Sequence, residues 1–160
     1  IWIGDIMERV VNKLIDKGCT ISTMESCTGG GVANAITSIE GSSAVLRFSA
    51  VTYSNEYKIK MGVSSEVIDK YSVYSMETAV EMSTNIAKFA NSDYGVGITG
   101  KLNRADENNL HGDDSTIYVS VYDVKNDKYY NKVLKAIRDN RKDNKELVIE
   151  EVVNILLEII

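Results

Sequence analysis

The sequence predicts an α/β fold, a three-layer α/β/α sandwich built around a mixed β-sheet. Apolar residues alternate along the chain between a helical spacing of three to four and a strand spacing of two. Two neighbouring alternating segments late in the chain indicate an antiparallel strand pair within this sheet. Because no repeat, low-complexity stretch or linker interrupts the pattern, residues 1–160 are expected to form a single domain.

The first part of the chain predicts two helices and two strands. Residues 6–15 carry apolar side chains at helical spacing, and Gly18 is expected to end this helix. Residues 19–24 alternate as a short strand does. After a glycine-rich break, residues 32–39 return to helical spacing. Residues 44–53 are rich in β-branched and aromatic side chains, so a second strand is expected there.

The second part of the chain predicts further helices, a buried strand, a long polar loop and a hairpin. We expect helices at 55–61, 65–71, 76–90 and 143–160, strands at 94–98, 116–122 and 129–136, and a loop at 101–115. Asn126 and Asp127 suit the tight turn of the hairpin. The loop is too long for a simple connection, which is typical of loops with a function.

Composition excludes several classes of protein. With 18 Lys and Arg against 23 Asp and Glu, the net charge is -5, which argues against a general nucleic-acid binder. No apolar run approaches the ~18 residues of a membrane span, and no signal peptide is evident. Two Cys residues do not make a disulfide framework, so we expect a cytoplasmic protein. Because the chain begins with Ile, we expect it to be a piece of a longer gene product.

The segment from Glu25 to Gly31, which reads ESCTGGG, is the strongest local feature. A strand ends there, small hydroxyl and glycine residues follow, and a helix begins, as in an anion or phosphate cradle. The alternative is that Ser26 or Thr28 is simply the N-cap of the helix. Cys27 is either a thiol activated by the helix N-terminus or a small packed residue. Neither nucleotide-binding glycine motif is present.

A second cluster pairs the Gly41-Ser42-Ser43 turn with the segment from Tyr53 to Lys58. A serine hydroxyl needs a base to become a nucleophile, a desolvated lysine can be that base, and a tyrosine can relay the proton. The strand predicted between the two segments could bring Ser43 and Lys58 toward one site. The alternative is a surface turn and a solvated lysine.

Charged residues near the end of the chain give weaker signals. His111, the single histidine, lies beside Asp113 and Asp114 in the polar loop, where a solvated residue is expected rather than a metal ligand or a triad member. A basic cluster lies around the start of the last predicted helix, and it is either an anion site or a solvated group of charges. Its members are Arg138, Arg141, Lys142 and Lys145.

Together these segments resemble the CinA C-terminal domain family, which includes nicotinamide mononucleotide deamidases. Residues 25–30 read ESCTGG, residues 41–43 read GSS and residues 53–58 read YSNEYK, where the family has ESCTGG, PGSS and YSNEAK. Further matches lie at residues 61–63, 72–75, 97–100 and 139–141, the last reading DNR where the family has GDR. The resemblance runs almost end to end.

The resemblance implies hydrolysis of nicotinamide mononucleotide to nicotinate mononucleotide and ammonia. It also implies that no metal or other cofactor takes part, that the partner is a small-molecule nucleotide, and that the protein is a homo-oligomer. No nucleic-acid or membrane partner is expected. By position, the implied site residues are Ser26, Ser43, Tyr53 and Lys58 for catalysis, and Thr28, Gly29, Gly30, Thr99, Gly100 and Arg141 for substrate binding.

Roles for these residues follow from their chemistry as hypotheses. Ser43 is expected to be the nucleophile, Lys58 the general base and Tyr53 the proton relay. Ser26 and nearby backbone N–H groups would then hold the oxyanion. The alternative makes Ser26 the nucleophile and Ser43 a helper. The 5′-phosphate is assigned to Arg141 and the turn at residues 28–30, because a guanidinium suits its oxygens.

The loop at residues 101–115 departs from the family pattern, since its glycines and prolines are missing. Leu102, Asn103 and Arg104 are expected to crowd a surface that the family leaves open to the substrate. The loop therefore either binds a different ligand or has lost its function. This leaves two alternatives to the deamidase, an inactive nucleotide-binding or interaction domain and an amidase for another small amide. The set of Ser43, Tyr53 and Lys58 favours an enzyme.

Overall fold

A five-stranded mixed sheet forms the centre of the molecule. The computed structural model describes residues 2–104, 107–108 and 112–160. The strands are β1 (Ile21–Glu25), β2 (Ala50–Val51), β3 (Tyr94–Gly100), β4 (Thr116–Asp123) and β5 (Lys128–Lys135). Their order in the sheet is β2-β1-β3-β4-β5, with β1 parallel to β2 and β3 and with β4 antiparallel to both its neighbours. The predicted hairpin of the last two strands is confirmed.

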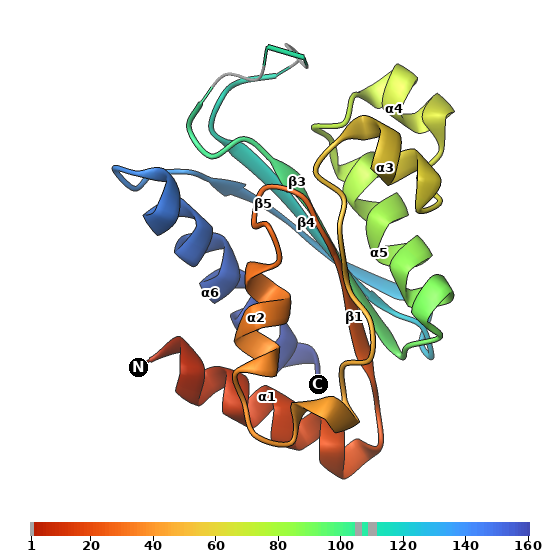
Figure 1. Cartoon of the computed structure of the whole chain (residues 1–160), viewed down its shortest axis with the longest axis vertical. Helices are drawn as coiled ribbons and strands as arrows, with labels where there is room; N and C mark the ends of the chain where they lie inside the picture. Colours follow the sequence, from red (N-terminus) through yellow and green to blue (C-terminus); the bar gives the residue numbers. More distant parts are fainter. Residues whose placement is uncertain (1, 105–106, 109–111) are drawn as a thin grey trace.

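Helices cover both faces of the sheet (Figure 1). One layer holds α1 (Ile3–Lys17), α2 (Gly31–Thr37) and α6 (Arg141–Ile159), and the other holds α3 (Asn55–Lys60), α4 (Ser65–Tyr71) and α5 (Met76–Ala90). The predicted three-layer sandwich with a mixed sheet is therefore confirmed. None of the helices in the described part of the chain is long and apolar enough to cross a membrane.

Most predicted elements lie where their apolar periods place them. Helix α5 has the predicted bounds, and α1 ends at Gly18, which adopts a left-handed φ of 64°. Helix α5 contacts β3 very closely, because a Cβ atom at Gly97 would lie 2.3 Å from the carbonyl oxygen of Ala79. A glycine is thus required where the helix backbone meets the strand.

The strand predicted at residues 44–53 is mostly wrong. Strand β2 has only two residues, and Ser42–Ala44 forms a 3₁₀ turn. The segment does run beside β1, but Thr23 donates its backbone N–H to the side-chain Oγ of Ser49 at 3.0 Å instead of to a backbone carbonyl. A side chain thus replaces a ladder partner, which keeps the regular strand short.

Candidate active site

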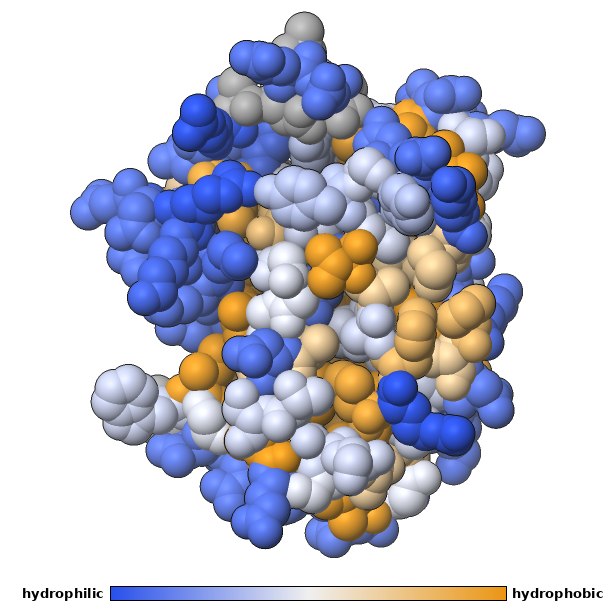
Figure 2. Space-filling view, viewed as in Figure 1, coloured by the Kyte–Doolittle hydropathy of each residue, from blue (hydrophilic) through white to orange (hydrophobic). Residues whose placement is uncertain are grey.

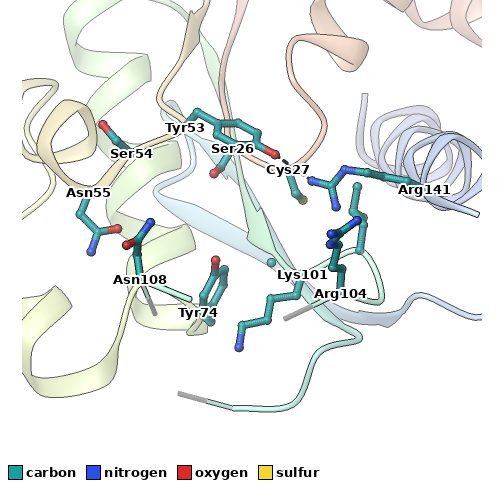
Figure 3. A pocket seen from close by; sticks show the side chains of 12 residues that line it. Ser26, Cys27, Tyr53, Ser54, Asn55, Tyr74, Lys101, Arg104, Asn108 and Arg141 are labelled. Atoms are coloured by element: carbon teal, nitrogen blue, oxygen red, sulfur yellow. Dashed lines mark hydrogen bonds between the residues drawn. The ribbon is translucent and has the colours of Figure 1, made fainter. Parts of the chain in front are cut away.

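A cavity of about 710 Å³ is lined by residues at the carboxyl ends of β1 and β3. Both strand ends lie in the upper part of Figure 1. This volume is in the usual range for small-ligand sites, and open α/β sheets bind ligands at this edge. Figure 3 shows side chains from several elements around it. The lining residues are Ser26, Cys27, Tyr53, Ser54, Asn55, Tyr74, Gly100, Lys101, Leu102, Arg104, Asn108 and Arg141.

A hydrogen-bonded pair of Ser26 and Lys58 forms the chemical centre of this cavity. Ser26 follows the last residue of β1, where its backbone N–H donates to the carbonyl of Ile98 at 3.0 Å. The Nζ of Lys58 donates to the Oγ of Ser26 at 3.0 Å and to the carbonyl oxygen of Thr52 at 2.6 Å. A serine hydroxyl within hydrogen-bonding distance of an amine has the geometry of a nucleophile and its base.

The position of Lys58 on α3 explains why its side chain is inside the protein. Ser54 caps this helix by accepting from the N–H of Tyr57 at 3.2 Å, and Lys58 lies on the first turn that follows. The Lys58 side chain is only 1% exposed, unlike that of Lys60 on the opposite side of the same helix, which is 57% exposed. The helix thus directs Lys58 into the protein, and its two hydrogen bonds hold the Nζ at the serine hydroxyl.

Glu25 organises the turn that carries Ser26. Its fully buried carboxylate accepts hydrogen bonds from the hydroxyls of Thr23 and Thr28 at 2.9 and 2.6 Å. It also accepts from the backbone N–H groups of Val32 and Ala33, both at 2.9 Å. The positive end of α2 therefore faces a carboxylate of the protein itself. The N-cap position is Gly30, so neither the expected anion cradle nor the alternative cap by Ser26 or Thr28 is present.

The turn at Thr28, Gly29 and Gly30 lies beside the Glu25 carboxylate and outside the lining of the cavity. The Thr28 hydroxyl is bound to Glu25, and the two glycines adopt left-handed φ angles of 59° and 92°. A Cβ atom at Gly29 would lie 3.4 Å from the Nζ of Lys145 on α6. None of the three residues is among those that line the cavity. The turn thus encloses the Glu25 carboxylate, which corrects the expectation that it holds a ligand phosphate.

Ser43 lies at the wrong end of the sheet to be the nucleophile. It is exposed in the 3₁₀ turn, two residues before Val45, whose carbonyl accepts from the N–H of Ile21 at the start of β1. The chain then runs alongside β1 to its other end, a distance of roughly 20 Å at the rise of an extended chain. The fold therefore separates Ser43 from Lys58, because a strand between two residues places them at opposite ends.

Tyr53 and Arg141 meet on the cavity wall. Arg141 is the first residue of α6, and its Nη2 donates to the hydroxyl oxygen of Tyr53 at 2.7 Å (Figure 3). This contact joins the segment after β2 to the start of the last helix. The expected relay to Ser43 is not possible at this distance, and the structure instead makes Tyr53 the partner of Arg141.

Thr99 and Gly100, at the end of β3, have different roles. Thr99 is fully buried and donates its hydroxyl to the carbonyl of Val73 at 2.9 Å, so it supports the wall without lining it. Gly100 lines the cavity, and a Cβ atom there would lie 2.5 Å from the Cα of Ile117. Of the two expected binding residues, Gly100 reaches the cavity and Thr99 does not.

Of the two further candidates from the sequence, Cys27 and His111, the structure describes only the cysteine. Cys27 lines the cavity, but burial raises the pKa of its thiol to about 12, so the alternative of a small packed residue holds. His111 lies outside the described residues. Asp113 binds the N–H of Ser115 at 2.8 Å and the Nζ of Lys135 at 3.1 Å. Within the described ranges, no group of three His, Cys, Asp or Glu side chains could hold a metal ion.

The basic cluster around the start of α6 divides into separate contacts. Arg138 forms an ion pair with Glu150 at 2.7 Å, and this hydrogen bond raises the pKa of the guanidinium. Lys145 lies behind the turn at Gly29. Lys142 is exposed, and only Arg141 reaches the cavity.

The start of the divergent loop contributes residues that the motifs did not indicate. Leu102 is 3% exposed and joins the hydrophobic core, and it also lines the cavity. Lys101 and Arg104 line the cavity together with Asn55 and Asn108. The apolar Leu102 at the start of a polar loop is the signal in the sequence that this segment is anchored.

Comparison with known proteins gives a consistent result. A family profile described as the CinA C-terminal domain matches residues 4–160. A CinA-like protein of Kosmotoga olearia is 50% identical over 94 residues, which are 58% of this chain and 23% of that protein. A putative competence-damage inducible protein of Clostridium kluyveri is 46% identical over 96 residues, 59% of this chain and 23% of that protein. The chain thus spans about a quarter of the length of these relatives.

Solved structures share the whole fold. A CinA superfamily protein of Klebsiella pneumoniae has a TM-score of 0.90 at 23% identity, with 99% of this chain and 97% of that chain covered. A competence/damage inducible protein of Agrobacterium tumefaciens has a TM-score of 0.86 at 25% identity, with coverages of 98% and 94%. The arrangement of strands and helices is therefore one that experiment has found in other proteins.

Proposed function

The chain belongs to the CinA C-terminal domain family, and from this membership we propose that it is an amidohydrolase that converts nicotinamide mononucleotide to nicotinate mononucleotide and ammonia. The observation that carries the proposal is the 3.0 Å hydrogen bond between the Nζ of Lys58 and the Oγ of Ser26 on the wall of a nucleotide-sized cavity. The pair lies in the family's ESCTGG and YSNE-x-K patterns.

In the first half of the reaction, Ser26 attacks the amide. Its Oγ forms a bond to the carbonyl carbon while its proton passes to the neutral Nζ of Lys58. We assign the backbone N–H of Cys27, which follows Ser26 and lines the cavity, to the negatively charged carbonyl oxygen, since such donors stabilise the tetrahedral intermediate. The C–N bond then breaks, and the leaving nitrogen takes the proton from Lys58 and departs as ammonia.

In the second half, water hydrolyses the ester that remains on Ser26. Lys58 accepts a proton from the attacking water, and a second tetrahedral intermediate forms in the same oxyanion site. Its collapse breaks the bond to Oγ, which regains the proton from Lys58. The acid product gives its proton to solvent, where the released ammonia takes it up, and leaves as a carboxylate, and the pair returns to its starting protonation state.

Geometry favours this assignment over the roles first expected from sequence. Ser26 contacts Lys58, whereas Ser43 is at the far end of β1. A buried lysine that is held by two hydrogen bonds beside a serine is costly to maintain, which supports a retained activity over an inactive binding domain.

The test is ammonia release from nicotinamide mononucleotide by the purified chain and three variants. Ser26→Ala and Lys58→Met are expected to lower kcat by at least about 10³-fold, since members of such a pair act as a unit. Ser43→Ala should stay within about twofold of the unchanged protein. Lys60→Met on the exposed side of α3 is the matched control for Lys58→Met, and circular dichroism verifies that each variant is folded.

Two outcomes would contradict the proposal. Full turnover by the Ser26→Ala protein would show that Ser26 is not the nucleophile. A loss of kcat in Ser43→Ala equal to that in Ser26→Ala would support Ser43 as the nucleophile instead. Absence of ammonia release from the unchanged protein, with nucleotide binding retained, would instead indicate a binding domain.

A further inference from the structure

We propose that Arg104 and Arg141 form a two-guanidinium clamp for the phosphate monoester of the ligand, and that Arg104 determines the specificity of this chain for phosphorylated substrates. The inference rests on the proposed function, because it concerns the same cavity. Arg104 belongs to the divergent loop at residues 101–115, where the family has a glycine-rich pattern instead. The proposal therefore gives this loop a role.

The first step is that the turn after β1 cannot supply the phosphate site. The backbone N–H groups at the start of α2 already donate to the carboxylate of Glu25, and the Thr28 hydroxyl does the same. These donors are therefore not available to a phosphate. Cationic side chains elsewhere on the wall are the stronger candidates for recognition of the anion.

The second step separates the three cationic side chains that line the cavity. The Nζ of Lys101 lies 3.6 Å from a carboxylate oxygen of Asp114 and 4.9 Å from the ring centre of Tyr74, so its charge is already engaged. Arg141 donates to the neutral hydroxyl of Tyr53. Among the described residues, no carboxylate lies within ion-pair distance of Arg104 or Arg141.

The third step is that the two arginines share one part of the wall. Both line the main cavity and also a smaller adjoining cavity of about 190 Å³ between the loop and the start of α6. Figure 3 shows both guanidinium groups on the same side of the main cavity. Asp139 lies in the smaller cavity, whereas the described lining of the main cavity has no acidic residue.

The loop holds Arg104 in this place through its anchored beginning. The backbone N–H of Lys101 donates to the carbonyl of Thr116 at 3.1 Å, and Leu102 is buried in the core. Asn103 adopts a left-handed φ of 67°, a conformation that Asn tolerates better than most residues. The chain bends at residues 102–104, and exposed Arg104 lies at the cavity.

The chemistry of the pair suits a phosphate dianion. Each guanidinium can donate two parallel hydrogen bonds to phosphate oxygens, and two of them can balance a charge of two. The chain as a whole carries a charge of -5, so this positive wall is a local feature that attracts an anion to the cavity. Figure 2 shows hydrophilic side chains over the loop after β3 and over the first turns of α6, which keep this edge in contact with water.

The experiment compares nicotinamide mononucleotide with nicotinamide riboside, which lacks the phosphate. Arg104→Gln is expected to raise KM for the mononucleotide about 10–100-fold with kcat nearly unchanged, and to change kcat/KM for the riboside less than twofold. Arg104→Lys should recover part of the loss. Arg47→Gln, an exposed arginine on the segment between the 3₁₀ turn and β2, is the matched control and should leave both substrates unaffected.

A binding measurement keeps the result independent of turnover. Thermal stabilisation of Ser26→Ala and of Ser26→Ala/Arg104→Gln by the mononucleotide is measured over a concentration series. Loss of stabilisation in the double variant supports the clamp even if the unchanged chain releases no ammonia, in which case only the deamidase proposal fails. If Arg104→Gln behaves as Arg47→Gln does, or lowers kcat/KM equally for both substrates, the clamp is wrong and the deamidase proposal stands.

Discussion

Cys27 shows how burial controls reactivity at a single residue. The thiol is next to the proposed nucleophile and lines the cavity. Desolvation by burial raises its pKa from 9.0 to about 12, which outweighs the lowering by positive charge on Arg141 and on protonated Lys58. A thiol is nucleophilic only as the thiolate, so Cys27 is inert beside the proposed nucleophile.

We predict that iodoacetamide at pH 8 alkylates the partly exposed Cys19 well before Cys27. Because the pKa of Cys27 is raised, the folded state keeps its proton to higher pH than the unfolded chain. The contribution of the protonated Cys27 thiol to the free energy of unfolding is therefore complete below pH 9 and is lost as the pH rises from 9 toward 12. Peptide mass spectrometry over time gives the two rates, with Cys19→Ser as the control, and faster labelling of Cys27 would contradict the raised pKa.

At the residue scale, the motifs indicated residues that the structure brings together, but Ser43 is not among them. Ser26 and Arg141 line the cavity, and Lys58 is hydrogen-bonded to Ser26. Ser43 was misplaced because its distance from Lys58 depends on the direction in which the chain between them runs. Chain direction follows from sheet pairing, which no local pattern in this segment shows.

Helix α2 and the turn before it form the element on which the site depends. The helix has only seven residues and no side-chain cap at its N-cap position. Glu25 instead serves as the cap from within β1, and the chain from Ser26 to Gly30 wraps around its carboxylate. The position of the nucleophile and the stability of the helix therefore share one buried charge.

Glu25→Gln is expected to lower the free energy of unfolding by about 3 kcal/mol, since hydrogen bonds to a charged acceptor contribute about 1.5–3 kcal/mol each and two backbone donors depend on it. A glutamine amide has one acceptor oxygen and would direct an N–H group at a backbone N–H. Urea denaturation measures the change. Glu56→Gln, which removes an exposed pair with Lys60 at 3.3 Å, should cost at most about 0.5 kcal/mol. Equal effects of the two substitutions would show that the buried carboxylate is not the cap.

Elements with a sustained apolar period were predictable, and those held by side chains were not. The period of α5 gave its bounds, because one face of that helix lies against the sheet along its whole length. The segment at residues 44–53 has strand composition but takes a side-chain partner at Ser49. Composition measures whether side chains suit a sheet, and it does not reveal which backbone groups are paired.

At the scale of the whole molecule, the cavity depends on segments that are far apart in the sequence. Its wall combines the end of β1, the start of α3, Tyr74 between α4 and α5, the end of β3, the loop that follows and the first residue of α6. Motifs identified all of these segments except the loop. The contribution of Arg104 could not be predicted, because it requires both the burial of Leu102 and the left-handed turn at Asn103.

Since a ligand in this cavity contacts all of these segments at once, its binding should stabilise the entire fold. For Ser26→Ala, which holds the substrate without turnover, nicotinamide mononucleotide at 100 times its Kd is expected to add about 2.7 kcal/mol to the free energy of unfolding. For a chain of this length that corresponds to a rise in Tm of about 5–10 °C. Differential scanning calorimetry measures the shift, with inorganic phosphate at the same concentration as the control for ionic effects. A single transition that moves as a whole shows that the cavity is formed by the cooperative unit. No shift, or one matched by inorganic phosphate, would mean that the loop at residues 101–104 has changed the cavity for a ligand other than this nucleotide.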